Sequence, residues 1–350
     1  MFPSTDLTRT LQPTFTRGDV VTLLVEGDVD LVDVAHKEAL LRAGRSYGTL
    51  LTPEHAPSPL QQQTYERTLL RHGPRLGALL AGLSRTVLTT HPEAVYVSLA
   101  RAGTPVGCAL RRVAADAGRD VPHYTVSIIR GEGLDPEALR RIRAFHPRAT
   151  LVFVDGWSGK GAIAATLRAS VPADVPWVLA LLCDPAGVAT HAATWDDLLL
   201  PHAALNATVS GLLSRTFVQA RGQLHGARLE RDLAAHDVSA TYVDALVALA
   251  RTHDPAPPAE AHMRPITAAA HVQDLAATFG ELDPTRIKPG IGEATRVFLR
   301  RTPARLLLRE QDHPDTAMLR ELADGQGVPV SVHPALPYAA AALIASGRAP

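Results

Sequence analysis

The stretch Thr150-Leu-Val-Phe-Val-Asp-Gly-Trp-Ser-Gly-Lys-Gly-Ala-Ile163 decides the fold. Residues 151–154 are a run of β-branched and apolar side chains, which is typical of a strand covered on both faces in a parallel sheet. We expect Asp155 to end this strand, a glycine-rich turn to span 156–161, and a helix to begin at Ala162. The stretch therefore predicts an α/β protein built around a parallel sheet.

The turn carries groups suited to an anion. Its backbone N–H groups and the helix N-terminus favour negative charge. Lys160 can neutralise a phosphate, Ser158 can donate to a phosphate oxygen, and Asp155 can accept from ribose hydroxyls. Many α/β proteins have such a turn for packing reasons alone, so the two interpretations stay open. The spacing is neither that of a P-loop nor GxGxxG, so neither a P-loop ATPase nor a Rossmann dehydrogenase is supported.

A second strand-to-helix turn lies at residues 100–103, after a predicted strand at 95–99. Thr104 suits the N-cap of the next helix, and Pro105 suits its first turn. The planar guanidinium of Arg101 suits a phosphate or pyrophosphate. In a doubly wound sheet, both turns open at the carboxyl edge, where ligands bind. Two such turns together favour a phosphate-binding site more strongly than either alone.

This pair of turns resembles the type I phosphoribosyltransferases. The resemblance implies that phosphoribosyl pyrophosphate or a nucleotide is the ligand, that Mg²⁺ bridges the substrate, and that Asp155 and Arg101 act in catalysis. The other residues that it implies in substrate binding are Ala102, Gly103, Thr104, Arg130, Gly156, Ser158, Gly159, Lys160, Gly161, Asn206, Ser210 and Arg215. Two departures stand out, because Val154 replaces the first of two adjacent acids and the turn is a residue short. Another sugar-phosphate ligand, or loss of transferase activity, stays open.

More of the chain resembles one bacterial branch of that superfamily. This branch is found with tellurite-resistance and stress genes and goes by the name cysteine protease StiP. The resemblance covers roughly residues 15–250. The matching segments are 98–107, 123–131, 154–163, 205–217 and 225–227.

Composition indicates an ordinary globular protein of 350 residues, with 46% hydrophobic residues and no net charge. Cys108 and Cys183 form no disulfide framework, which fits a cytoplasmic location. We expect neither a signal peptide nor a membrane span, since the N-terminus lacks a charged and apolar leader and no apolar run is long enough. The histidines show no metal-binding i, i+4 pair, so we predict no protein-held metal site.

The chain divides into a phosphoribosyltransferase-like α/β domain at 15–250, a proline-rich linker at 251–265 and a small domain at 266–350. Alternating strands and helices between 94 and 184 predict parallel pairing, and residues 61–90 predict a helix that covers the sheet. Residues 184–217, with Asn206, Ser210 and Arg215, are either a pocket wall or a polar-faced helix. In the small domain we expect helices at 268–279, 293–301, 316–324 and 338–346, and strands at 305–309 and 328–332.

The small domain contains a second recognisable segment, Gly290-Ile-Gly-Glu-Ala-Thr-Arg296. With the helix and strand that follow, it resembles the Gly-x-Asn-Glu-x-Thr-Lys signature of pelota and L7Ae-type RNA-binding domains. The resemblance implies that Gly290, Glu293 and Arg296 face RNA and that Lys288 and Arg300 contact phosphates. Gly292 stands where the signature has Asn. A structural or docking role for this domain therefore stays open beside RNA binding.

Three functions follow from these observations. The first is a phosphoribosyltransferase, acting in nucleobase or nucleotide metabolism during stress. The second is a non-catalytic ribose-phosphate or nucleotide sensor coupled to RNA binding. The third and most remote is a cysteine protease, which needs a thiolate paired with histidine. Cys108 lies among apolar helix residues, and Cys183 precedes Asp184, whose charge disfavours a thiolate.

Overall fold

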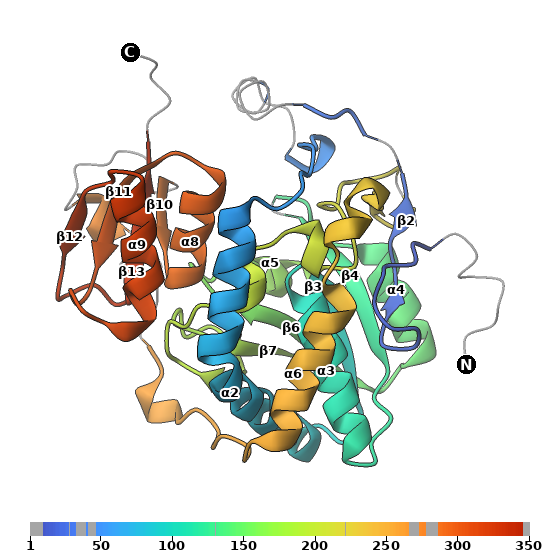
Figure 1. The fold of residues 1–350 in the computed structure, drawn as a ribbon. Helices are drawn as coiled ribbons and strands as arrows, with labels where there is room; N and C mark the ends of the chain where they lie inside the picture. The colour runs from blue at the N-terminus through green and yellow to red at the C-terminus, as the bar shows by residue number, and fades with distance from the viewer. Residues whose placement is uncertain are drawn as a thin grey trace.

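The computed structural model describes residues 10–27, 29–32, 40, 47–129, 131–220, 222–265, 273–277 and 286–345. Within these ranges the chain forms two α/β parts that lie side by side (Figure 1). Arg130, one of the predicted binding residues, lies outside the described residues.

The larger part is built on a sheet with strand order β1-β4-β3-β6-β7-β8, in which all neighbours on this path are parallel. The strands are β1 Val21–Thr22, β3 Ala94–Ala100, β4 His123–Ile129, β6 Thr150–Trp157, β7 Trp177–Cys183 and β8 His191–Thr194. Short β5, Gly133–Leu134, pairs antiparallel with β4, and β2, Val25–Glu26, pairs with β9, Gly226–Ala227. The predicted parallel sheet is confirmed. Asp155 does not end β6, because the strand keeps pairing with β7 as far as Trp157 opposite Cys183.

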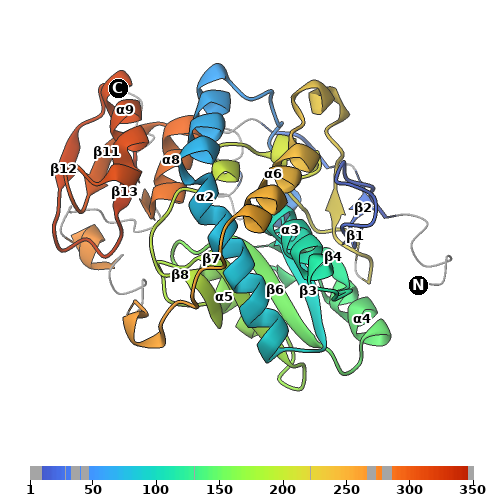
Figure 2. The same cartoon turned by 60° about the horizontal axis from the view of Figure 1, so that its bottom comes forward.

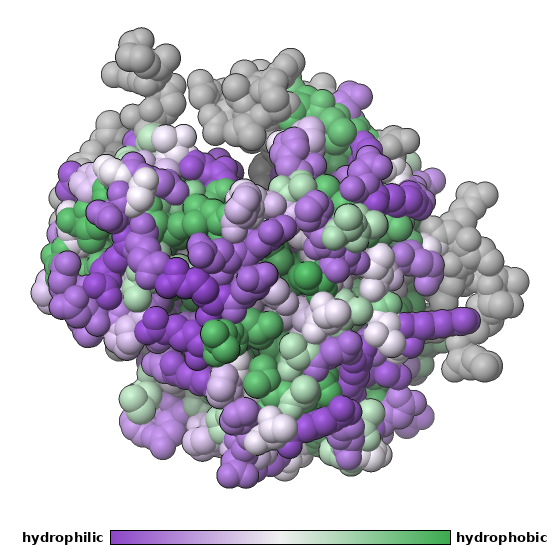
Figure 3. Space-filling view, in the orientation of Figure 1, coloured by the Kyte–Doolittle hydropathy of each residue, from purple (hydrophilic) through white to green (hydrophobic). Residues whose placement is uncertain are grey.

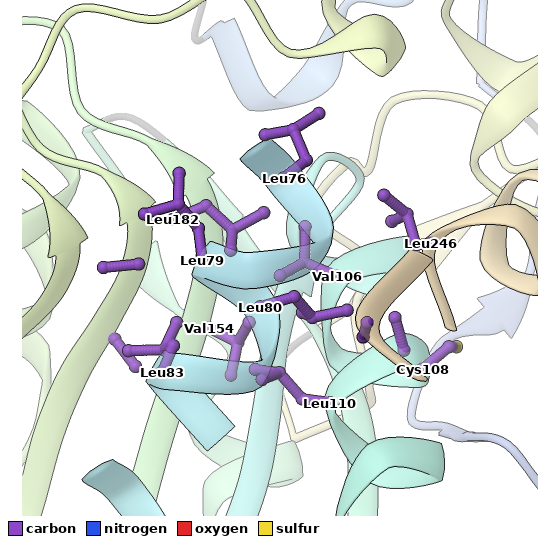
Figure 4. Packing of buried hydrophobic residues seen from close by; sticks show 14 of the residues in the cluster. Leu76, Leu79, Leu80, Leu83, Val106, Cys108, Leu110, Val154, Leu182 and Leu246 are labelled. Carbon is purple, nitrogen blue, oxygen red and sulfur yellow. The ribbon is translucent and has the colours of Figure 1, made fainter. Parts of the chain in front are cut away.

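Helices cover both faces of this sheet (Figures 1 and 2). On one face lie α2 Pro59–Thr90, α3 Gly103–Asp116 and α6 Ser239–Thr252, and on the other lie α4 Pro136–Phe145 and α5 Ala162–Ser170. Alternate residues of β6 point to opposite faces: Val152 and Val154 pack toward α2 and α3, whereas Leu151 and Phe153 pack toward α4 and α5. Figure 4 shows Val154 in the first of these two clusters. The start of α5 at Ala162 is as predicted. The single-turn and 3₁₀ segments are Tyr47–Thr49, Pro201–Ala203, Ala207–Val209, Arg231–His236, Ala261–Met263 and Pro314–Thr316.

One segment, Arg231–Thr252, is long and apolar enough to span a membrane by length and composition alone. Its last 14 residues form α6, which packs against α2 and α3. The side chains of Tyr242, Val243 and Leu246 are fully buried there. A core helix of a globular domain gives the same compositional signal, and the apolar face of this one is used in packing the sheet.

The smaller part has a four-stranded sheet with order β10-β13-β11-β12. Its strands are β10 Ile287–Pro289, β11 Pro303–Leu308, β12 Val330–Val332 and β13 Ala340–Ile344, and its helices are α8 Ile291–Arg300 and α9 Ala317–Gly325. The helix predicted at 338–346 is wrong, because this segment is β13. Its alanines favour a helix locally, but they are buried between β10 and β11, and that packing overrides the local preference. Of the helix predicted at 268–279, only residues 273–277 are described, and they are helical.

Candidate functional site

The two predicted turns meet at the carboxyl edge of the central sheet, because β3 and β6 are neighbours. Gly103, the first residue of α3, lies directly against β6. A Cβ atom at Gly103 would lie 2.1 Å from the carbonyl oxygen of Val154 and 3.2 Å from the Cα atom of Asp155. The common edge is therefore confirmed. Gly103 has a packing reason of its own, since only a residue without a side chain lets α3 begin this close to β6.

The Arg101 side chain is engaged within the protein. Its guanidinium donates to Glu54 at 2.6 Å and to the carbonyl oxygen of Leu213 at 3.1 Å. The side chains of Arg101 and Glu54 are only 12% and 7% exposed. The charge of Arg101 is therefore neutralised by Glu54 here, and its predicted contact with pyrophosphate stays a prediction. The peptide bond between Ala100 and Arg101 is cis.

The hydroxyl groups of Thr104 and Ser158 are also engaged within the protein. Thr104 does not cap α3, since Ala102 is at the N-cap, and the Thr104 hydroxyl bonds to that of Thr125 at 2.8 Å. Ser158 is buried and donates to the carboxylate of Asp184. It also accepts from the N–H of Ala186 at 3.2 Å. Both hydroxyls therefore make hydrogen bonds within the protein, and their predicted roles in substrate binding stay predictions.

Asp155 is the predicted residue whose environment is most unusual. Burial raises the pKa of its carboxyl group to about 7, while the hydrogen bond from the Gly156 N–H and the charge of Arg296 oppose the rise. The N–H of Gly156 donates to it at 2.8 Å. Glu293, whose negative charge also raises this pKa, belongs with Arg296 to α8 of the smaller domain. The carboxyl edge of the large sheet is thus faced by the smaller domain.

The polar side of α8 packs on the larger domain. Glu293, Arg296 and Arg300 follow the i, i+3, i+7 spacing of one helix face. The Arg296 guanidinium lies over the ring of Trp157 at 5.2 Å and pairs with Glu293 at 3.4 Å. A Cβ atom on Gly292 would lie 3.2 Å from that same ring. The Trp157 ring therefore leaves little room for a side chain at the position where the signature has Asn.

Arg300 of α8 contacts the larger domain. It donates to the carbonyl oxygens of Ala203 at 3.0 Å and Leu205 at 2.6 Å, across the boundary between the domains. Burial lowers the pKa of its guanidinium. In this arrangement Arg300 clamps the two domains together, and its predicted phosphate contact stays a prediction.

Asp197, which the sequence did not single out as a site residue, caps α8 from the larger domain. The N–H of Ile291 donates to its two carboxylate oxygens at 2.8 and 3.0 Å, and the N–H of Ala339 donates at 3.1 Å. Burial raises the pKa of Asp197 to about 6, against the opposing effect of these hydrogen bonds. Gly290 precedes the helix with a positive φ of 93°. The only signal in the sequence was the adjacent pair Asp196-Asp197.

The remaining predicted residues lie around this boundary. The carbonyl oxygen of Gly159 accepts from the hydroxyl of Tyr338 at 2.9 Å, which joins the 156–161 turn to the smaller domain. Gly161 takes the left-handed conformation at the N-cap of α5. The others are partly or fully buried: Lys160, Asn206, Ser210, Arg215 and Lys288.

A cavity of about 230 Å³ lies farther along the same boundary, between α2 and the α9 region. In Figure 3 the surface where α2 meets the smaller domain is largely hydrophilic. Arg67 pairs there with Glu321 at 2.6 Å, with both side chains about half exposed. The residues that line the cavity include Thr68, Arg71, His72, Leu199, Asp315 and Met318.

Neither cysteine presents an accessible thiol in the described conformation. Cys108 is fully buried in the apolar cluster between α3 and α6 (Figure 4), and Cys183 is fully buried at the end of β7. Burial raises the pKa of both thiols. Among the described residues there is no group of three or more His, Cys, Asp or Glu that could hold a metal ion. The resemblance to the transferases implies a Mg²⁺ ion that arrives with the substrate. This ion stays a prediction.

Comparison with known proteins places the chain in a family. The family model described as "Tellurite-like stress resistance cysteine protease StiP" matches residues 13–247. The chain belongs to this family. A protein named "Cysteine protease StiP" from Acinetobacter baylyi is 34% identical over 351 residues, which cover 93% of this chain and 92% of that protein. The "PELOTA RNA binding domain" model matches residues 266–346.

These findings decide between the functions predicted from sequence. The phosphoribosyltransferase prediction is corrected, because the family and the relative are both named as a cysteine protease. The ribose-phosphate sensor gains no support from them either. The resemblance to the tellurite-resistance and stress family is confirmed, as is the pelota-type domain at the C-terminus. The predicted parallel α/β architecture is confirmed, whereas the transferase activity predicted with it is not.

Proposed function

We propose that this StiP-family protein acts in stress resistance through RNA binding by its C-terminal domain. The match of residues 266–346 to the pelota RNA-binding domain carries this proposal. Residues 286–309 add seven basic side chains against one acid, Glu293. A local excess of Lys and Arg favours the phosphate backbone of nucleic acids, although the whole chain carries no net charge.

Fluorescence anisotropy with end-labelled bulk transfer RNA tests this proposal. We expect binding by the full chain that weakens as salt concentration rises. Replacing Lys288 or Arg305 by Ala should lower the slope of log affinity against log salt by about one for each phosphate interaction that is removed. The matched control is Arg140→Ala on α4, an exposed arginine of the other domain. Absence of salt-dependent binding by the unmodified chain would contradict the proposal.

We propose peptide hydrolysis as a second function, because the relative of similar length is named a cysteine protease. Cys183 is the better candidate nucleophile, since it ends β7 opposite Trp157 at the carboxyl edge. His202 lies at the same edge, with its ring 5.5 Å from that of Trp157. Its Nδ1 bonds to the Tyr242 hydroxyl, and its Nε2 has no hydrogen-bond partner among the described residues. The thiol is covered and protonated here, so hydrolysis requires this edge to open.

A peptidase assay on labelled casein separates the two cysteines. Cys183→Ser should abolish turnover, because serine at this position is a far weaker nucleophile than a thiolate. Cys108→Ser should retain turnover, since that thiol lies within α3 in the apolar core. Equal activity of both variants and the unmodified chain would rule out thiol hydrolysis at Cys183.

A further inference from the structure

The N-terminus of α8 already holds an anion, and that anion is a side chain of the other domain. The N–H groups of Ile291 and Ala339 come from two separate segments of the smaller domain and converge on the Asp197 carboxylate. A helix N-terminus favours negative charge, whether from a carboxylate or from a phosphate. The position is therefore an anion receptor that the larger domain fills.

The rest of the α8 face is occupied in the same way. Arg296 covers Trp157, Gly292 touches the same ring, and Arg300 donates to two carbonyl oxygens of the segment 203–205. Tyr338 adds its bond to Gly159. Figures 1 and 2 both show α8 as the helix of the smaller domain that lies beside the larger one. The groups on α8 that the pelota resemblance assigns to RNA each contact protein instead.

One surface cannot contact two large partners at once. We propose that the α8 face binds either the larger domain or RNA, with the Asp197 carboxylate standing where an RNA phosphate would bind. RNA would then separate the domains and uncover the carboxyl edge with Asp155. The inference rests on the proposed RNA binding and adds to it that binding is coupled to domain opening.

The chemistry of the boundary suits an interface that opens. Asp197 and Arg300 are charged groups taken out of water, which is costly even when they are hydrogen-bonded. Asp155 and Glu293 bring two carboxyl groups toward each other across the boundary. When the domains separate, these groups return to water. Their hydration compensates for part of the free energy that is lost with the contacts between the domains. The exposed pair of Arg67 and Glu321 contributes little to holding the domains together.

A disulfide staple tests the competition directly. A Cβ atom on Gly159 would lie 3.3 Å from Cγ of Glu293, so the double variant Gly159→Cys, Glu293→Cys places two sulfur atoms within bonding reach. Oxidation should lock the domains together, and a reductant should release them. Anisotropy with end-labelled bulk transfer RNA is measured in both states of the same protein. We expect at least a roughly tenfold lower affinity in the oxidised state, because the competent open form is then removed.

Two further proteins complete the experiment. The single variant Glu293→Cys is the control for the loss of Glu293 and for effects of redox conditions on the native thiols. Its affinity for transfer RNA should be the same with and without reductant. Asp197→Asn removes the competing charge and should raise RNA affinity severalfold. If the oxidised and reduced staple bind RNA equally well, the competition is overturned and RNA binding stands. If neither state nor the unmodified chain binds, RNA binding fails and this inference fails with it.

Discussion

At the scale of single residues, we expect the raised pKa of Asp155 to make the stability of the protein depend on pH. Its folded-state pKa of about 7 lies above the ordinary value of 3.8, so its contribution to stability is complete below about pH 4 and is lost as pH rises through about 7. The charged groups that face it are Glu293 and Arg296 of α8. Asp155→Asn should flatten this decline and raise Tm at about pH 8 by a few degrees.

Thermal unfolding followed across this pH range checks the prediction. The control is Asp120→Asn. The Asp120 side chain is 93% exposed and lies between α3 and β4 of the larger domain, before β4 begins. Its melting curve should follow that of the unmodified chain at every pH. A parallel fall of Tm in Asp155→Asn and the unmodified protein would show that Asp155 does not ionise as described.

Sequence reasoning at this scale found the unusual residue but not its partners. Asp155 could be singled out because an acid between a buried strand and a glycine-rich turn is visible in one short segment. The partners of Arg101 and Ser158 could not be found this way, since Glu54 and Asp184 are 47 and 26 residues distant. A charge pair formed only by folding leaves no local pattern, so both side chains looked available for a ligand.

At the scale of elements, we expect alanine substitutions at two glycines to change the free energy of unfolding in opposite directions. Gly103→Ala places a methyl group 2.1 Å from the Val154 carbonyl oxygen, and overpacking of this kind costs about 1–3 kcal/mol. Gly325 ends α9, and a methyl group there would meet nothing within 4 Å, so Gly325→Ala should gain up to about 1 kcal/mol. Urea unfolding of both variants measures the free energies. A stable Gly103→Ala variant would mean that α3 can move away from β6.

The elements themselves were largely predictable where one pattern dominated. Strand β7 belongs to the alternation of strands and helices predicted between 94 and 184, because its continuous apolar run between polar turns admits few alternatives. Strand β13 was missed, since four consecutive alanines carry a helix preference that only the neighbouring strands overrule. Strand β8 was missed because it is short and lies within a segment rich in turn residues. Burial inside a sheet depends on the whole fold, so the local sequence of either segment could not predict it.

At the scale of the whole molecule, the defining feature is the docking of one domain on the other. Its contacts join positions far apart in the chain, as when Asp197 caps α8 and Tyr338 bonds to Gly159. Each domain resembles a family by itself, and neither resemblance indicates the other domain as a partner. The RNA signature was therefore recognised from sequence, while the surface that covers it was not.

Arg300 gives a prediction about this docking. Arg300→Ala leaves the carbonyl oxygens of Ala203 and Leu205 without their donor, a loss of about 1–3 kcal/mol that favours domain opening by roughly fivefold to somewhat more than a hundredfold. Hydrogen exchange of the peptide that contains Ile291 measures it, because its N–H is protected by Asp197 only while the domains are docked.

We expect faster exchange at Ile291 in Arg300→Ala and unchanged exchange in Arg305→Ala, whose side chain is exposed on β11 of the same domain. Peptides from the buried strand β6 should exchange equally in all three proteins, since opening of the boundary leaves the central sheet intact. Faster exchange of β6 as well would show that Arg300 stabilises the fold as a whole. Unchanged exchange at Ile291 would show that the two domains stay docked without this clamp.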